Sequence, residues 1–194
     1  MTTIIVSEDH QYDESRNIVI YSNGVEKNYD DIGIKIDIYQ TRVNGWFFSV
    51  AEKLITDGMS PGDYVCVMVA LSYLEGVQQF REGKETPKRK SGEWFKTSAS
   101  RVFYDQPAAV IDRLWEEARC GLFHAGFTNG KVYLSHNAMK AIELKNDSIH
   151  INPKKFLKCV SEDFSKYVSD LRDETSIELR KNFENLWDDL WSKS

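Results

Sequence analysis

Hydrophobic and polar residues alternate along much of the first 36 residues, and this pattern predicts β-strands. Two short runs, at residues 18–21 and 25–29, flank the tripeptide Ser22-Asn23-Gly24. An Asn-Gly step between two such runs is the strongest short-range signal for a β-hairpin. We therefore expect residues 1–36 to form an N-terminal β appendage that contains a hairpin.

From about Asp37 the apolar positions recur every three or four residues, which is the spacing of one face of an α-helix. The residues of this face are Val43, Trp46, Phe47, Val50 and Leu54. Gly58 stands where a helix needs a left-handed residue in order to end. The pattern predicts a first helix that buries this face and ends near Gly58.

The segment Ser60-Pro61-Gly62-Asp63 predicts the start of a second, long helix. It offers an N-cap hydroxyl, a proline at the first helical position and an acid in the first turn. The inward face of this helix is predicted to consist of Cys66, Val69, Tyr73, Val77 and Phe80. The spacing of these residues makes the helix largely buried.

Two further helices are predicted between residues 91 and 125. Ser91 is placed to cap a third helix that runs to about Phe103, and the tripeptide Asp105-Gln106-Pro107 begins a fourth. The inward face of the fourth helix is predicted to consist of Val110, Leu114, Ala118 and Leu122.

Short alternating runs at residues 132–134 and 149–151 predict a small β insertion between helices. Asn152-Pro153 then starts a further helix, and a capping box from Thr175 to Glu178 starts the last one. The chain is therefore predicted to be mainly α. We divide it into the β appendage at 1–36 and a helical domain at 37–194.

Composition narrows the class of protein. With 194 residues and 41% hydrophobic content, the chain is long enough to bury one sizeable core. Its three cysteines are widely spaced and include no C-x-x-C pair, so we expect neither a disulfide framework nor a zinc site. The histidines lack metal-ligand spacing and the chain has no phosphate-binding or dinucleotide-binding motif, so we also expect no metal and no cofactor. The longest apolar run, at residues 64–71, is too short to span a bilayer. We therefore expect no membrane partner and a cytoplasmic protein.

Charge is distributed unevenly along the chain. The net charge is -5, yet residues 81–101 carry seven basic and three acidic side chains. Within this segment Lys88, Arg89 and Lys90 lie in a predicted loop, where they are candidates for guiding a phosphate backbone. The alternative is an ordinary solvated loop, since charged loops are usually only solvated. Because the whole chain is acidic, any contact with RNA has to be local.

Arg119 and His124 are the candidate catalytic residues. A guanidinium can fork onto a phosphate, and an imidazole can exchange a proton near neutral pH. On a regular helix five positions correspond to about 140° of rotation and about 7.5 Å of rise, so the two side chains would not share one face. We expect Gly121 and Gly126 to let the helix loosen and bring them together. The alternative is that neither residue is catalytic. Arg119 would then interact with the helix dipole, and His124 would cap the helix or pack against it.

The segment Arg119-Cys120-Gly121-Leu122-Phe123-His124 matches the R-x4-6-H motif of the HEPN superfamily. Residues 69–76 resemble the long first core helix of these domains, and the similarity extends over residues 37–173. The resemblance implies a helical bundle that forms a homodimer in which the two motifs face each other. In active members this arrangement makes a metal-independent endoribonuclease, typical of toxin, stress or anti-phage systems.

Two residues near the motif bear on this hypothesis. Glu75, on the second predicted helix, is a candidate binding residue that could orient Arg119, although an exposed helical Glu is the commoner outcome. Cys120 departs from the family pattern, because active members often carry Asn, Asp or His directly after the Arg. The alternative is therefore a non-catalytic module of the same fold that binds nucleotide, RNA or a protein partner. An unrelated helical scaffold protein is a third interpretation.

Overall fold

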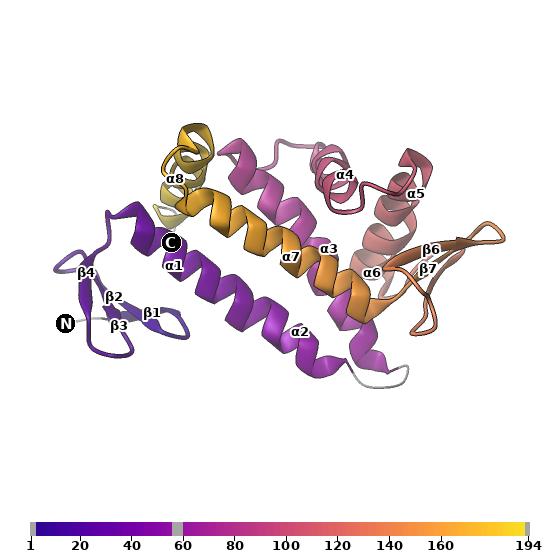
Figure 1. The fold of residues 1–194 in the computed structure, drawn as a ribbon, viewed down its shortest axis with the longest axis horizontal. Helices are drawn as coiled ribbons and strands as arrows, with labels where there is room; N and C mark the ends of the chain where they lie inside the picture. The colour runs from indigo at the N-terminus through magenta and orange to yellow at the C-terminus, as the bar shows by residue number, and fades with distance from the viewer. Residues whose placement is uncertain (1–2, 56–59, 193–194) are drawn as a thin grey trace.

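The computed structural model describes residues 3–55 and 60–192 of the chain. In this part of the chain the fold is mainly helical, as predicted, and the two small sheets lie at opposite ends of the helical bundle (Figure 1). The helices are α1 (Ile32–Thr41), η1 (Arg42–Phe48), α2 (Ser49–Leu54), α3 (Pro61–Glu82), α4 (Ser91–Val102), α5 (Ala108–Arg113), η2 (Leu114–Arg119), α6 (Cys120–Ala125), α7 (Pro153–Arg172) and α8 (Ile177–Trp191). The strands are β1 (Thr3–Ser7), β2 (His10–Asp13), β3 (Ile18–Tyr21), β4 (Glu26–Asn28), β5 (Val132–Leu134), β6 (Ile142–Lys145) and β7 (Ser148–Ile151).

The N-terminal sheet is an antiparallel meander in the order β1-β2-β3-β4. The predicted hairpin is confirmed: β3 pairs with β4, and Gly24 has a φ of 84° in the turn between them. The sheet packs against the helices through Tyr12 and Tyr29, whose rings lie 5.5 and 5.1 Å from the ring of Trp191 in α8. One continuous core therefore joins this sheet to the bundle.

Asp13 gives the N-terminal sheet a specific dependence on pH. Hydrogen bonds from Ser15 and from Arg16 lower the pKa of this buried carboxyl from 3.8 to about 2. Because the folded protein holds the carboxylate form, this contribution to stability is complete above pH 3.8 and is lost as the pH falls through about 2. We expect the urea midpoint of the wild type to drop across this range. The Asp13→Asn variant should drop less, and identical pH profiles would contradict the prediction.

The first helix begins earlier than the sequence pattern predicted. Helix α1 starts at Ile32 rather than near Asp37, because the Asp31 carboxylate accepts a hydrogen bond from the backbone N–H of Gly33 at 2.7 Å and caps the helix. Isoleucines at every second position from 32 to 38 resemble one buried face of a strand. In α1 the same spacing places them on different sides of the helix, and Ile34, Ile36 and Ile38 are all buried. The prediction failed because α1 is covered on several sides, so its pattern does not report a single face.

Helices α1, η1 and α2 form one uninterrupted helix, and its middle turns are π-helical. The backbone N–H of Ser49 donates to the carbonyl of Asn44, five residues back. The predicted inward face was wrong here: Trp46, Phe47 and Val50 are exposed, because the wider π turn changes which residues face the core. The predicted end at Gly58 lies outside the described residues.

Helix α3 is the central helix, packed against α2, α4, α7 and α8. Its predicted start is confirmed, since Ser60 is the N-cap and donates its backbone N–H to the Asp63 carboxylate at 2.7 Å. Cys66, Tyr73 and Val77 are buried as expected.

Two predicted helix caps were wrong. Ser91 is the first helical residue of α4 rather than its cap, which is Lys90. Thr175 does not cap α8, because its hydroxyl and backbone N–H both donate to Asp173, and Ser176 takes the N-cap position instead.

The predicted β insertion is present and has one more strand than expected. In the described chain its order is β5-β7-β6, with β5 parallel and β6 antiparallel to β7. Asn146 and Asp147 have φ values of 46° and 65°, so they form the tight turn between β6 and β7. The next helix, α7, starts as predicted, with the Asn152 side chain accepting from the backbone N–H of Lys155 at 3.1 Å.

Candidate functional site

The Arg119/His124 motif lies on the helix formed by α5, η2 and α6. Its inward face is the predicted one, with Val110, Leu114, Ala118 and Leu122 all buried. The turns directly before the motif are π-helical, since the backbone N–H of Cys120 donates to the carbonyl of Trp115, five residues back. The helix ends at Gly126, which has a φ of 79°. The expected loosening is therefore found upstream of Arg119, and the helix does not fray near Phe123.

Arg119 is held in place on three sides. Its Nη2 donates to Oε2 of Glu75 at 3.1 Å, which is the predicted contact between α3 and the motif. Its guanidinium also lies over two rings, 4.9 Å from the centroid of Trp115 and 4.6 Å from that of Phe123. The side chain of Arg119 keeps 21% of its surface exposed. The Nε atom is buried without a hydrogen bond, so only the terminal N–H groups of the guanidinium are candidates for binding a ligand.

His124 directly follows Phe123 in the sequence, and its side chain is exposed. Within the part of the chain that the structure describes, the imidazole forms no hydrogen bond or ion pair, with Arg119 or with any other residue. The predicted convergence of Arg119 and His124 is thus not formed inside a single chain. The imidazole is free to act on a ligand or on a second copy of the protein.

Gly121 serves a different purpose from the one expected. A Cβ at this position would lie 2.6 Å from the carbonyl oxygen of Phe127 and 2.9 Å from the backbone nitrogen of Asn129. The loop after α6 therefore folds back directly onto the helix. Glu117 fixes this loop, because its carbonyl accepts from Asn129 at 2.7 Å and its carboxylate accepts from the backbone N–H of Lys131 at 3.1 Å. This packing fixes the position of the end of the helix that carries His124.

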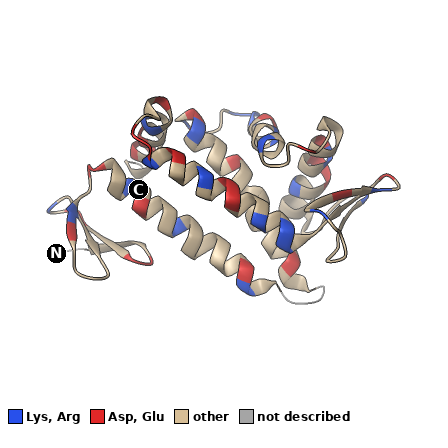
Figure 2. Cartoon of the chain, viewed as in Figure 1, with Lys and Arg blue, Asp and Glu red and all other residues tan. Residues whose placement is uncertain are grey.

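The basic loop approaches the motif through Trp115. Lys88, Arg89 and Lys90 are exposed, and Lys90 forms an ion pair with Glu93. A Cβ on Gly92, at the start of α4, would lie 3.0 Å from the Trp115 indole. The Arg119 guanidinium lies on the same indole ring. The Trp115 side chain therefore lies between the end of the loop and Arg119. Elsewhere the basic and acidic residues are interspersed, and Figure 2 shows no continuous basic face in this view.

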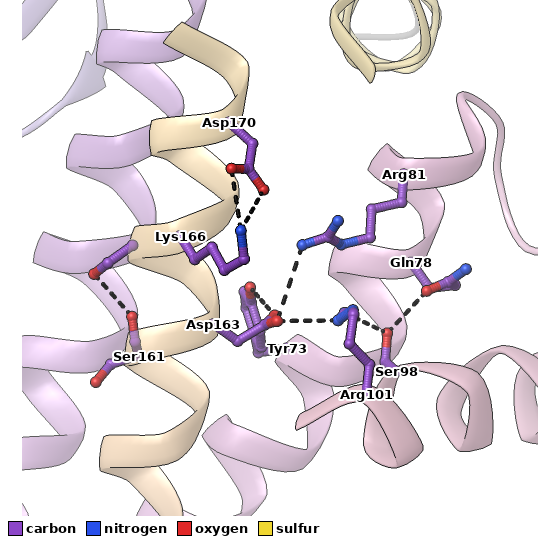
Figure 3. Close-up of polar contacts among 10 residues, drawn as sticks. Tyr73, Gln78, Arg81, Ser98, Arg101, Ser161, Asp163, Lys166 and Asp170 are labelled. Carbon is purple, nitrogen blue, oxygen red and sulfur yellow. Dashed lines mark hydrogen bonds and ion pairs between the residues drawn. The ribbon is translucent and has the colours of Figure 1, made fainter. Parts of the chain in front are cut away.

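Sequence reasoning missed a partly buried ionic cluster between α3, α4 and α7 (Figure 3). Asp163 of α7 accepts from Arg101 at 3.0 Å and from the Tyr73 hydroxyl at 3.1 Å, and Arg81 lies 3.9 Å away. Burial lowers the pKa of Arg101, and the neighbouring Arg81 lowers it further. A signal was present in the sequence, since Asp163 lies next to Phe164 on the apolar face of α7. Its partners lie on α3 and α4, far away in the sequence, and the local pattern of residues carries no information about such contacts.

A second missed contact joins His136 to the start of α3. The imidazole Nε2 lies 3.0 Å from Oδ2 of Asp63, whose carboxylate is fully buried and also caps the helix. Cys66, one turn further along, is also buried. Burial raises the pKa of its thiol to about 12, and the nearby Asp63 charge adds to the effect. We interpret this contact as the structural support of a buried helix cap.

No group of three or more His, Cys, Asp or Glu side chains in residues 3–55 and 60–192 is arranged to hold a metal ion. None of the helices described in these ranges has both the length and the apolar character needed to cross a membrane. Comparisons with protein-family models, with curated proteins and with solved structures found no match to this chain.

Proposed function

We propose that the protein is a HEPN-like, metal-independent endoribonuclease that acts as a homodimer. The observation that supports this proposal best is the arrangement of the motif. Arg119 is fixed by Glu75 and two aromatic rings, while His124 is exposed and unpaired in the described chain at the end of the same helix. Phosphodiester cleavage needs a preorganised cation and a free imidazole, and in this proposal the dimer brings the two together.

The reaction explains why two copies are required. When the 2′-hydroxyl of RNA attacks the adjacent phosphate, one group removes the proton of the hydroxyl and another protonates the leaving oxygen. Positive charge stabilises the phosphorane-like transition state. One chain supplies a single imidazole at the motif, whereas two motifs across a dyad supply two imidazoles and two guanidiniums. In this proposal Arg119 binds the scissile phosphate and His124 transfers the proton.

The proposal is tested by incubating the purified wild-type protein with RNA in EDTA. We expect cleavage to continue in the chelator and to leave cyclic phosphate ends, because the attacking group belongs to the RNA itself. Cleavage that requires an added divalent metal, or products that lack cyclic phosphate ends, would contradict the proposal. Sedimentation of the same sample should show a dimer at the concentrations at which cleavage is measured.

Neutralising the basic loop should weaken RNA binding without changing the chemical step. We expect a Lys88→Gln, Arg89→Gln, Lys90→Gln triple variant to raise KM about three- to tenfold. The variant makes fewer contacts with phosphates, so RNA binding releases fewer counterions and is less favourable. The slope of log KM against log salt should fall by up to about 2. The turnover number kcat should stay unchanged.

The control for the loop variant carries the same charge change at exposed lysines outside the loop. Lys27, Lys154 and Lys158 are exposed in the first sheet and on α7, so their triple Gln variant has the same net charge. If both variants raise KM equally, the loop has no specific role in binding.

A second candidate function is a non-catalytic module of the same fold, and one observation favours it. The Arg119 guanidinium is already engaged by Glu75 and by two rings, and Cys120 occupies the place where active family members often carry a polar residue. Such a module would bind RNA or nucleotide without cutting it, or would bind a protein partner. A wild-type protein that shifts RNA in a gel but leaves it intact would favour this candidate.

A further inference from the structure

A large pocket opens between the N-terminal sheet and helices α1, η1, α3 and α8. Its volume of ≈ 1130 Å³ is just above the range of about 300–1,000 Å³ typical of small-molecule sites. Most of its lining residues are apolar, and three of them remain largely exposed: Ile4 (48%), Trp46 (43%) and Phe47 (47%). Exposed apolar side chains around a pocket indicate that something binds there. Neither Arg119 nor His124 lines the pocket, so this site is separate from the proposed function.

Arg42 is the unusual polar group of this pocket. Its guanidinium faces two indole rings, 5.3 Å from the centroid of Trp46 and 5.9 Å from that of Trp191. Within residues 3–55 and 60–192 it has no carboxylate partner, and its Nε is buried without a hydrogen bond. The Nε atoms of Arg81 and Arg119 are also buried without a hydrogen bond, but these two guanidiniums lie 3.9 and 3.1 Å from carboxylates. Because a guanidinium stays charged at neutral pH, this half-buried cation, which has no carboxylate partner in the described chain, can pair with an anionic ligand.

Several other polar groups that line the pocket already have partners within the protein. The hydroxyls of Tyr12 and Tyr73 donate to side-chain oxygens, both at 3.1 Å, and the Ser72 hydroxyl donates to a backbone carbonyl at 2.9 Å. Glu14, an exposed acid among the lining residues, forms no ion pair with Arg42 in the described chain. The pocket therefore offers a ligand the Arg42 cation and an apolar wall, with the exposed Glu14 carboxylate also among the lining residues.

Gly76 provides a second, independent observation. It lies in the interior of α3, where glycine weakens a helix, and it lines the pocket. A Cβ at this position would meet no atom of the described residues within 4 Å. Close packing inside the protein therefore does not require a glycine here. A side chain at this position would fill the pocket, so the glycine keeps the pocket open.

We propose that this pocket binds a free acyl carboxylate, with the carboxylate on the Arg42 guanidinium and the alkyl chain against the apolar wall. The planar guanidinium matches a carboxylate through two parallel hydrogen bonds. The alkyl chain gains from leaving water along the apolar residues. A ligand with many polar groups, such as a nucleotide, would leave those groups unpaired against this wall.

The proposal is tested by calorimetric titration of the wild-type protein with dodecanoate below its micelle concentration. We expect saturable binding of one dodecanoate per chain. Dodecanol and dodecylamine, which lack the anion, should bind at least about tenfold more weakly, because they lose a charged hydrogen-bonded pair. Each methylene removed from the acid should weaken binding about fourfold. Phospholipid vesicles should not compete, which distinguishes a free acyl carboxylate from a membrane lipid.

Two variants locate the binding site. Arg42→Gln should weaken dodecanoate binding about 10- to 100-fold, because the charged pair is lost. Gly76→Phe should abolish binding by filling the pocket, and the open space around Gly76 lets the variant fold. Circular dichroism and thermal melting of Gly76→Phe establish that it is folded. This second variant keeps the test valid if Arg42→Gln does not fold.

Three results would overturn the proposal. The first is dodecanol binding as tightly as dodecanoate. The second is a folded Gly76→Phe variant that binds dodecanoate as the wild type does. The third is a wild-type protein that binds no dodecanoate; if the wild type is then a dimer that dissociates in the Gly76→Phe variant, a second copy of the chain fills the pocket.

Discussion

The His124→Ala variant is expected to cleave RNA at least about a hundredfold more slowly than the wild type, since a positioned acid or base contributes about 10²–10⁴ to a rate. Arg119→Ala should lose at least as much, because it removes the charge that stabilises the transition state. Single-turnover assays in EDTA measure the chemical step directly. His150→Ala, which changes a half-exposed histidine in β7, is the matched control and should cleave at the wild-type rate. Wild-type rates in both motif variants would contradict the proposed mechanism.

Mixing the two motif variants tests whether the site is shared between two chains. Half of the dimers in a randomised equal mixture carry one Arg119→Ala chain and one His124→Ala chain. Each such dimer keeps one intact Arg119 and one intact His124, on different chains. We expect cleavage in the mixture to rise above the rate of either variant alone, because a mixed dimer has both a guanidinium and an imidazole, and to stay well below the wild-type rate, because the second imidazole is missing. No recovery, with mixed dimers demonstrated by native mass spectrometry, would contradict a shared site.

Local chemistry explains which parts of the fold could be predicted. The starts of α3 and α7 were found because a capping side chain and a following proline act within four residues of the chain. The turn at Gly24 was found for the same reason, since an Asn-Gly step restricts the backbone by itself. These features need no information from distant parts of the chain.

The errors arise where distant contacts decide the outcome. The face of the first helix was misassigned at Trp46 and Phe47 because the π-helical turns of η1 shift the register, and the period of 3.6 residues does not reveal them. Helix α1 was missed at Ile34 because that stretch is covered on several sides. In both cases the packing of the folded chain overrides the local pattern.

The candidate site shows the same division. The contact between Glu75 and Arg119, 44 residues apart, could be predicted because an acid on a core helix usually has a basic partner. The close approach of Gly92 to Trp115, which brings the basic loop to the motif, had no signal in the sequence. Arg42 gave no signal either, because its lack of a carboxylate partner is visible only in the folded chain.

Removing the carboxylate of Asp163 is expected to be the most damaging single change to stability. The side chain is only 10% exposed and lies between the charged groups of Arg81 and Arg101. In Asp163→Ala the Arg101 guanidinium and the Tyr73 hydroxyl lose their hydrogen-bond acceptor, and Arg81 loses an ion-pair partner 3.9 Å away. Breaking a fully buried ion pair from one side costs about 3–5 kcal/mol, and we expect a smaller loss, about 2–3 kcal/mol, because Arg81 and Arg101 remain 19% and 30% exposed to water. Urea unfolding of the wild type and the variant measures this loss.

Asp170 provides the matched control on the same helix. Its carboxylate pairs with Lys166 at 3.3 Å, and both groups face solvent. Asp170→Ala should therefore change the free energy of unfolding by less than about 1 kcal/mol. The double variant Asp163→Leu, Arg101→Met should be less destabilised than the single variant Asp163→Leu. In the double variant an apolar pair replaces the ion pair, so Arg101 is no longer left as an unpaired charge. If Asp163→Ala destabilises the protein no more than Asp170→Ala does, then solvent rather than Asp163 balances the two arginines.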